Sequence, residues 1–181
     1  TISQYALSCI SQTLNYEKGS LDKLPYISKI SDLPRKIVDI SKFDWDMFEN
    51  SWNFKSLSIL PVNTILNSTL RTSYSEWISQ NQATIVEMQR LEEENNRLFI
   101  DAYGLQDELT PEVPIEQITL TVNPAYRYGV KGTEQERNAR FRADTMTELV
   151  SYTIGCTMGS YSLDQEGLVY AHAGNEGFDA S

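Results

Sequence analysis

The 181-residue chain is long enough for one domain with a substantial core, and its 40% apolar and 10% aromatic residues exclude an intrinsically disordered polypeptide. Its formal net charge of −10 argues against a protein that coats nucleic acid with its whole surface, because phosphate contacts require Lys and Arg in number. No apolar run approaches the roughly 18 residues of a transmembrane helix, so we expect no membrane association.

The two cysteines, Cys9 and Cys156, are far apart in the sequence, and each lies in an apolar helical pattern. They support neither a disulfide framework nor a zinc site, and they favour a reduced, cytoplasmic protein. Because Thr1 begins neither a signal peptide nor a natural open reading frame, we expect the sequence to be part of a longer protein.

The N-terminal part contains three short predicted elements. Apolar residues at helical spacing predict a helix over residues 2–15, and an extended piece follows at 21–27, where a proline argues against a central strand. Ser31 or Asp32 can cap a second helix that has Pro34 in its first turn and continues to about residue 40.

Residues 43–54 are rich in aromatic side chains and show little periodicity of their own. Aromatic residues at this density usually fix a loop onto a neighbouring element. We therefore prefer a satellite hydrophobic cluster beneath a long connection to a surface that stacks on a ligand.

An apolar stripe predicts one long helix over residues 69–103, or two nearly collinear helices, with Gly104 at the C-terminal cap. The stripe is interrupted by polar residues at 79–82 and 92–96. It comprises Tyr74, Trp77, Ile78, Ile85, Met88, Leu91, Leu98, Phe99 and Ala102. A helix of this length would measure roughly 50 Å, so we expect it to project or to brace two bodies.

An acidic turn follows from residue 104 to Pro114, and the alternation over residues 115–122 predicts a short strand. Residues 126–132 are predicted to form a loop. Thr133 and Glu136 form a capping-box pattern for a last helix that runs to about Met158. We expect its inward side chains to be Met146, Leu149, Val150, Ile154 and Met158, and we expect Gly155 and Gly159 to permit a close approach. The glycine-bearing tail from residue 167 is expected to be loose.

Asn123-Pro124-Ala125-Tyr126 follows the predicted strand and is the sharpest local motif. DNA adenine methyltransferases use an Asn-Pro-Pro-Tyr turn in such a position to hold a flipped base. Here alanine replaces the second proline, and a cofactor-binding glycine loop is missing from the preceding sequence. We therefore interpret the motif as a coincidence and not as a catalytic turn.

Other candidate chemistry is weaker still. His172, the only histidine, has no Cys or acidic partner at ligand spacing, so we expect a surface or packing residue. Asp44, Asp46 and Glu49 suggest a divalent-cation site, but they lack the alternating pattern and the glycine of a calcium loop, and a solvated helix edge is preferred. We therefore predict no catalytic, cofactor-binding or metal-binding residues in this sequence.

Charge is distributed unevenly along the chain. Between Glu87 and Glu116 there are nine acidic residues against two arginines. The balance then reverses, and the candidates for contacts with a DNA backbone are Arg127, Lys131, Arg137, Arg140 and Arg142. Arg137 and Arg140 share a helix face that could neutralise phosphates without reading a base sequence. Pairing of these cations with the acidic stretch around Glu108 and Glu112 is an equal alternative.

Several passages resemble one protein family. The longest is Leu98–Pro114, and other segments agree in the same order. They are Thr13–Tyr16 with Gly19 and Leu24–Pro25, Asp44–Asp46 through Trp52, Phe141–Met146 with Ser160–Asp164, and Gly174–Asp179. Together they resemble part of the PglX-type adenine-specific DNA methyltransferases of BREX phage-defence systems, and of related type II restriction-modification methylases.

The resemblance implies a parent enzyme that transfers a methyl group from S-adenosylmethionine to the exocyclic amine of adenine in double-stranded DNA. The family's cofactor loop and catalytic turn lie upstream of this region, so no residue here corresponds to them. Partners implied are the remaining domains of the parent chain, duplex DNA and other defence-system proteins. The alternative hypothesis is a protein-interaction scaffold that docks such proteins without contacting DNA.

The predicted fold class is mainly α, with a long bracing helix, a helical bundle and a short β element near 115–122. The predicted organisation has four parts. They are the end of a preceding methyltransferase or target-recognition part (1–30), a helical spacer with the long helix (31–103), an acidic turn, strand and loop (104–132), and a basic helix with a glycine-bearing tail (133–181).

Overall fold

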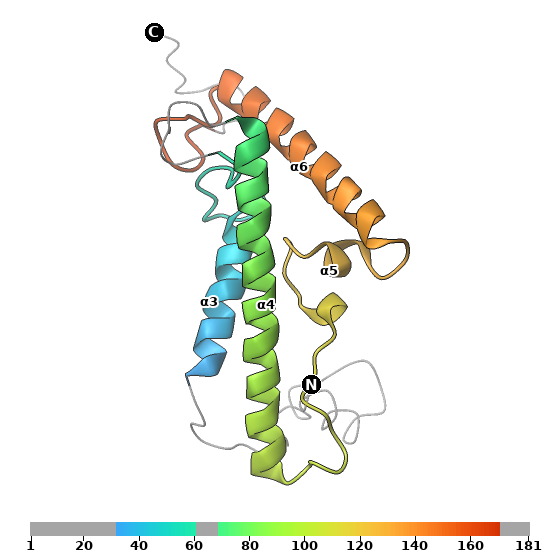
Figure 1. The fold of residues 1–181 in the computed structure, drawn as a ribbon. Helices are drawn as coiled ribbons and strands as arrows, with labels where there is room; N and C mark the ends of the chain where they lie inside the picture. Colours follow the sequence, from blue (N-terminus) through green and yellow to red (C-terminus); the bar gives the residue numbers. More distant parts are fainter. Residues whose placement is uncertain (1–31, 61–68, 171–181) are drawn as a thin grey trace, which may run out of the picture.

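The computed structural model describes residues 32–60 and 69–170 and is mainly α-helical, as predicted. The described residues form four α-helices and one 3-10 helix (Figure 1). These are α3 (Leu33–Asp46), α4 (Leu70–Tyr103), η1 (Ile115–Gln117), α5 (Pro124–Tyr128) and α6 (Glu134–Thr157). The expected helix over 2–15, the extended piece at 21–27 and the tail beyond residue 170, including His172, lie outside the described residues. None of the described helices has the length and apolarity needed to cross a membrane.

Helix α4 begins and ends where the sequence predicted. Thr69 is its N-cap, and a capping box joins the side chains and backbone N–H groups of Thr69 and Thr72. At the other end Gly104 adopts a left-handed conformation with φ of 67°, which lets the N–H of Leu105 bond the carbonyl of Ile100 at 2.9 Å. Helix α4 runs along most of the molecule, with α3 on one side and the segment 105–133 and α6 on the other (Figure 1).

Two residues of the polar interruption at 92–96, Glu93 and Asn96, bond the chain that returns along α4. Asn96 Nδ2 donates to the carbonyl of Pro111 at 3.2 Å, and Gln89 Nε2 donates to the carbonyl of Val113 at 2.7 Å. The N–H of Val113 in turn donates to the carboxylate of Glu93 at 3.2 Å. Gln89, Glu93 and Asn96 thus hold the returning backbone.

The main core lies where α4, the 113–122 segment and α6 meet. Trp77 of α4 stacks on Phe141 of α6, with ring centroids 5.6 Å apart and an interplanar angle of 12°. The buried members of this cluster are Trp77, Ile85, Met88, Val113, Ile118, Leu120, Val122 and Phe141. Side chains of α3 pack against its edge, so α4 is covered on both flanks.

The strand predicted over 115–122 is absent, and η1 occupies its first three residues. The alternation nevertheless identified the buried side chains, because Ile118, Leu120 and Val122 are almost completely inaccessible while Thr119 is exposed. No neighbouring strand pairs with this segment within the described chain; side chains bond its backbone instead. The alternation of apolar and polar residues therefore identified the buried face of this segment correctly, but the strand inferred from it was wrong.

A second cluster joins the aromatic stretch to the end of α6. Phe54, Leu57 and Ile59 pack on Tyr152, and Tyr161 stacks on Tyr152 with centroids 5.1 Å apart. The predicted satellite cluster is thus confirmed for Phe54, whereas Leu57 and Ile59 lie beyond the predicted stretch. It is wrong for Phe43, Trp45 and Trp52, which are exposed, the first two because α3 extends to Asp46 and turns them outward.

Helix α6 begins at the predicted capping box of Thr133 and Glu136 and ends with Met158 at its C-cap. Met146 and Leu149 are partly buried against the second cluster. The prediction that Val150, Ile154 and Met158 face inward is wrong, because all three are more than half exposed. Near its end, α6 packs through a different face from the one that carries these three side chains. The ring of Tyr161 lies against Gly155 there.

Candidate functional site

The Asn123 motif is a structural junction between the extended segment and α5. The predicted loop over 126–132 is partly helical, because Asn123 caps α5 by accepting the N–H of Ala125 at 3.1 Å. Its Nδ2 donates to the carbonyls of Ile115 and Ile118 at 2.7 and 2.9 Å. Because both ends of its amide are hydrogen-bonded and the side chain is buried, Asn123 stabilises the fold and is not available for catalysis.

Asp44, on α3, binds the backbone of the same extended segment. Its carboxylate, on the last turn of α3, accepts the backbone N–H of Thr121 at 2.7 Å and of Val122 at 3.1 Å. Asp44 is 3% exposed, so the expectation of a solvated acidic edge is wrong for this residue. Among the residues that the structure describes, no group of three His, Cys, Asp or Glu side chains is placed to hold a metal ion.

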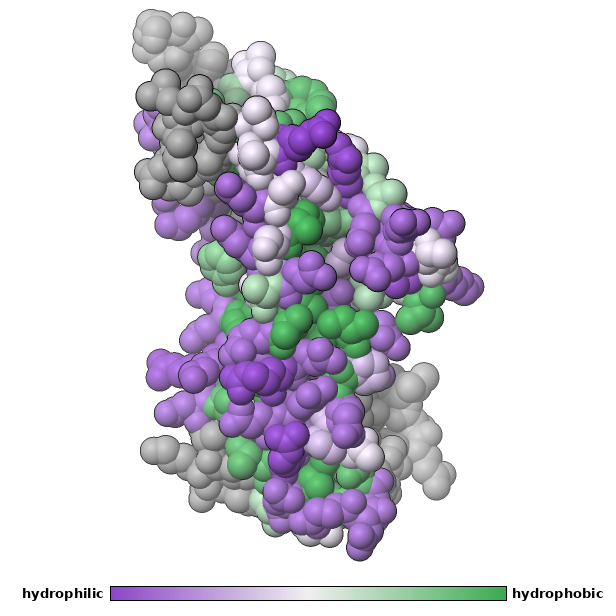
Figure 2. Space-filling view, viewed as in Figure 1, coloured by the Kyte–Doolittle hydropathy of each residue, from purple (hydrophilic) through white to green (hydrophobic). Residues whose placement is uncertain are grey.

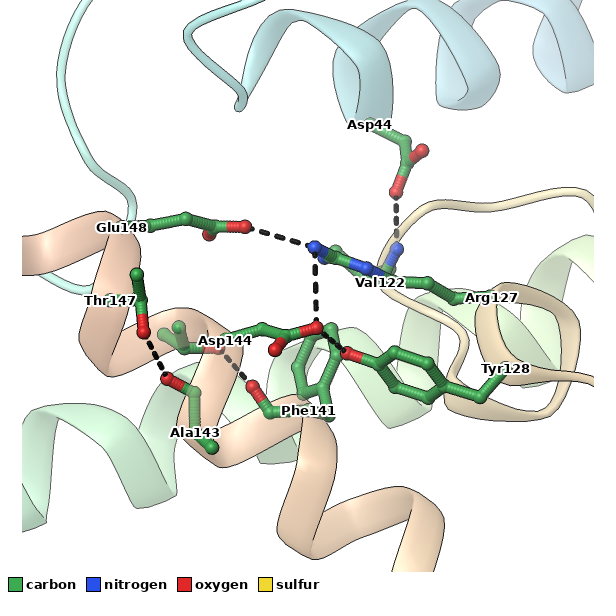
Figure 3. A network of polar contacts seen from close by, with 10 residues as sticks. Asp44, Val122, Arg127, Tyr128, Phe141, Ala143, Asp144, Thr147 and Glu148 are labelled. Atoms are coloured by element: carbon green, nitrogen blue, oxygen red, sulfur yellow. Dashed lines mark hydrogen bonds and ion pairs between the residues drawn. The ribbon is translucent and has the colours of Figure 1, made fainter. Parts of the chain in front are cut away.

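Arg127 of α5 joins α5 to α6 through ion pairs with Asp144 and Glu148, close to the bond between Asp44 and Val122 (Figure 3). Its Nη2 lies 3.0 Å from Glu148 and 3.8 Å from Asp144, and its side chain is about one quarter exposed. The guanidinium also lies 5.7 Å from the ring centre of Phe48. The predicted candidate Arg127 therefore has intramolecular acidic partners, which are on α6 and not in the acidic stretch around Glu108 and Glu112.

Tyr128 connects this network to the next arginine. Its hydroxyl donates to Asp144 at 2.7 Å, and burial, followed by this hydrogen bond, raises the pKa of the phenol above its ordinary value. On its other side, the guanidinium of Arg140 lies 4.7 Å from the centre of the Tyr128 ring. The ring thus fixes the position of an exposed cation through a cation–π contact.

The other predicted cations divide between two flanks of α6. Arg140 lies on the flank toward α5, where it contacts Tyr128, and Lys131 lies in the loop before the helix; both are exposed. Arg137 and Arg142 instead line a cleft between α4 and α6. Arg71, which sequence reasoning missed, lines a second groove together with Arg142, because the start of α4 lies beside α6.

The cleft between α4 and α6 has a volume of about 570 Å³. Its walls are mainly apolar and come from α4, the segment around Asn123 and the first turns of α6. Its charged lining residues are Glu134, Arg137 and Arg142. Hydrophobic side chains also gather on the viewed surface where α4 passes η1 (Figure 2). The cleft combines an apolar interior with a net positive edge, which suits an organic anion.

No protein-family model matches the chain. Two similar proteins cover nearly all of it. The chain is 38% identical over 176 residues to the adenine-specific methyltransferase BrxX of Escherichia coli O9:H4 (strain HS), with 96% of this chain and 14% of that protein aligned. It is 32% identical over 172 residues to the adenine-specific methyltransferase PglX of Lacticaseibacillus casei (strain Zhang), with 91% of this chain and 13% of that protein aligned. The chain thus spans a small part of the length of either relative.

Proposed function

We propose that this chain, which is homologous to one segment of the PglX-type adenine-specific methyltransferases of BREX systems, serves in such an enzyme as a non-catalytic helical spacer that positions double-stranded DNA. In this proposal the parent enzyme methylates DNA with S-adenosylmethionine in the cytoplasm, and the cofactor and catalytic groups come from other domains. The segment contributes geometry: α4 braces the molecule, and the start of α6 meets phosphates.

The observation that carries the proposal is the group of exposed cations on and beside the first half of α6. Lys131, Arg140 and Arg142 are exposed, and Arg71 adds a cation beside Arg142. Ring contacts position two of them, Arg140 over Tyr128 and Arg142 over Tyr74. Cations held in this way can contact phosphates without reading base sequence.

Arg127 has a different part in the proposal. Its partners Asp144 and Glu148 neutralise its charge, and its guanidinium is held between aromatic rings. It would therefore act as a positioning residue that keeps α5 against α6, so that Tyr128 can support Arg140. Loss of Arg127 should weaken DNA binding only indirectly, through movement of α5.

The test is fluorescence anisotropy of a labelled duplex titrated with the 181-residue chain at several salt concentrations. Replacing Lys131, Arg140 and Arg142 together by alanine should weaken binding and reduce the slope of log K against log salt by about 3, roughly one per lost phosphate contact. The matched control replaces Arg35, Lys36 and Lys42, three exposed cations of α3 on the far side of α4, and should change the slope little. Equal losses in both variants, or no binding at low salt, would contradict the proposal.

The second candidate function is a scaffold that docks other defence-system components without DNA. It is favoured by the apolar side chains that α6 leaves more than half exposed, Val150, Ile154 and Met158. If duplex DNA does not bind at low salt, while Val150→Ser and Ile154→Ser abolish association with another component, this second function is supported instead.

A further inference from the structure

The cleft between α4 and α6 contains a polar group that has no hydrogen-bond partner within residues 32–60 and 69–170. Asn81 lines the cleft from the middle of α4 and is 6% exposed. Its Nδ2 is buried and has no hydrogen-bond partner among the residues that the structure describes. Burying such a donor is unfavourable, so proteins normally pair it. Asn81 therefore has an unused donor beside the cleft, which rotation of its terminal torsion would bring to a ligand.

The side chains around Asn81 define the chemistry of that ligand. Ile78 and Phe141 line the same cleft and offer apolar surface, which a flat ring system would cover. The terminal torsion of asparagine is broad and nearly twofold, so either the donor or the acceptor end of the amide can turn toward the cleft. A heteroaromatic ring, whose edge carries both acceptors and donors, satisfies such an amide.

The charged residues of the cleft define the other end of the ligand. The charged residues that line the cleft are two arginines, Arg137 and Arg142, and one carboxylate, Glu134. Arg137 gives one guanidinium nitrogen to the carbonyl of Gly132 at 2.9 Å, and Arg142 lies 5.9 Å from the ring centre of Tyr74. Both guanidinium groups keep donors for an anion, since each has five N–H bonds.

We propose that this cleft binds a nucleotide-like ligand, with its heteroaromatic ring inside against Asn81 and its phosphate at Arg137 and Arg142. The volume of about 570 Å³ lies in the range of sites for small organic ligands. The site shares Arg142 with the proposed duplex contact but extends beyond it to the buried Asn81, because a phosphate backbone needs no ring pocket. A free mononucleotide and a nucleotide within a strand present the same chemistry.

The experiment uses flavin mononucleotide as a fluorescent probe of this ligand class, with riboflavin as the matched compound that lacks only the phosphate. Titration into the 181-residue chain should quench the probe saturably, and the mononucleotide should bind more tightly than riboflavin. Arg142→Ala should reduce the ratio of the two affinities by about tenfold, as expected for loss of a hydrogen bond to a charged group. Riboflavin binding should be unaffected by this substitution.

Asn81→Leu separates a ligand contact from a structural role. Because it replaces an unpaired buried amide by an apolar group of similar size, the urea midpoint should be unchanged or higher. Binding of both probes should weaken by about fivefold, since both carry the ring. Val150→Ser, on the exposed face of α6 outside the cleft, should change neither affinity. Non-saturable quenching, or unchanged binding to Asn81→Leu, would overturn the proposal.

Competition identifies the source of the ligand. Displacement of the bound probe by AMP but not by a short single-stranded oligonucleotide indicates a free nucleotide, and the reverse indicates a nucleotide within a strand. Both results support the site, whereas displacement by neither overturns it. Duplex binding by Asn81→Leu should equal that of the wild type, so failure of this inference and failure of the proposed DNA contact are distinguishable.

Discussion

Replacing Asp44 by alanine is expected to destabilise the fold more than any other single change on α3. The carboxylate is the acceptor for the backbone N–H groups of Thr121 and Val122, at 2.7 and 3.1 Å, and it is 3% exposed. Alanine would leave both N–H groups in a buried place without an acceptor. Hydrogen bonds to a charged group contribute about 1.5–3 kcal/mol each, so the loss should be about 3–5 kcal/mol.

That loss is a large part of the roughly 5–15 kcal/mol that stabilises a domain, and at about 2–4 °C per kcal/mol it should lower the melting temperature by on the order of 10 °C. Urea unfolding followed by helical circular dichroism measures it. Asp44→Asn keeps one acceptor oxygen and should lose less than the alanine variant. Asp39→Ala, an exposed aspartate of the same helix, should stay within about 0.5 kcal/mol of the wild type.

Two results would refute the role of the Asp44 carboxylate: unfolding of Asp44→Ala at the same urea concentration as the wild type, or an equal loss of stability in Asp39→Ala. The first result would mean that the extended segment 118–123 is held by its apolar side chains alone. The second would mean that the net charge of α3, and not the bonds to Thr121 and Val122, determines its stability.

Asn123→Ala removes the hydrogen bonds from Nδ2 to the carbonyls of Ile115 and Ile118, and it removes the α5 cap. It should therefore lower the free energy of unfolding, measured in urea, by about 2–4 kcal/mol. The pKa of Tyr128 is raised in the folded state, so its stabilising contribution is complete below about pH 10 and is lost as the pH rises further. Urea midpoints of Tyr128→Phe should therefore fall less between about pH 9 and 11 than those of the wild type; an equal fall would contradict this. In Gly155→Ala the new methyl would lie 2.6 Å from the Tyr161 ring, which should cost about 1–3 kcal/mol and weaken the near-UV dichroism of the tyrosines. Unchanged near-UV signal would show that Tyr161 moves without loss of packing.

The sequence predicted the helices that carry their own boundary signals. Helix α4 has Thr69 at its start and Gly104 at its end, and α6 has the Thr133 and Glu136 capping box. These signals are local, since each depends on residues within one turn of the helix end. For the same reason the predicted bounds of both helices agree with the structure to within a residue or two.

Features that depend on distant residues were not predictable in the same way. The bond from Thr121 to Asp44 joins positions 77 apart, and nothing near Asp44 indicates that its carboxylate replaces a strand partner. The polar residues at 92–96 suggested a bridging helix, although the structure uses two of them, Glu93 and Asn96, to hold the returning backbone. Local periodicity carries no information about such pairings.

The candidate site was predicted in part. The basic cluster was identified by charge alone, and the exposure of Lys131, Arg140 and Arg142 is compatible with it. Charge alone did not reveal that Arg127 is paired with Glu148, 21 residues later, or that Arg71 lies near Arg142. The cleft was missed altogether, because its key residue, Asn81, belongs to a polar interruption of a helix that was otherwise interpreted by its apolar stripe.

The segment from Pro111 to Asn123, which is extended on both sides of η1, has a consequence for how the molecule avoids unwanted association. An extended backbone with alternating buried side chains normally exposes a row of N–H and C=O groups, which can recruit a strand from another molecule. Here Gln89, Glu93, Asn96, Asp44 and Asn123 bond many of those groups through their side chains. The segment is therefore a poor template for β-aggregation, and its protection depends on a few polar side chains. Their loss would open an adhesive edge as well as loosen the fold.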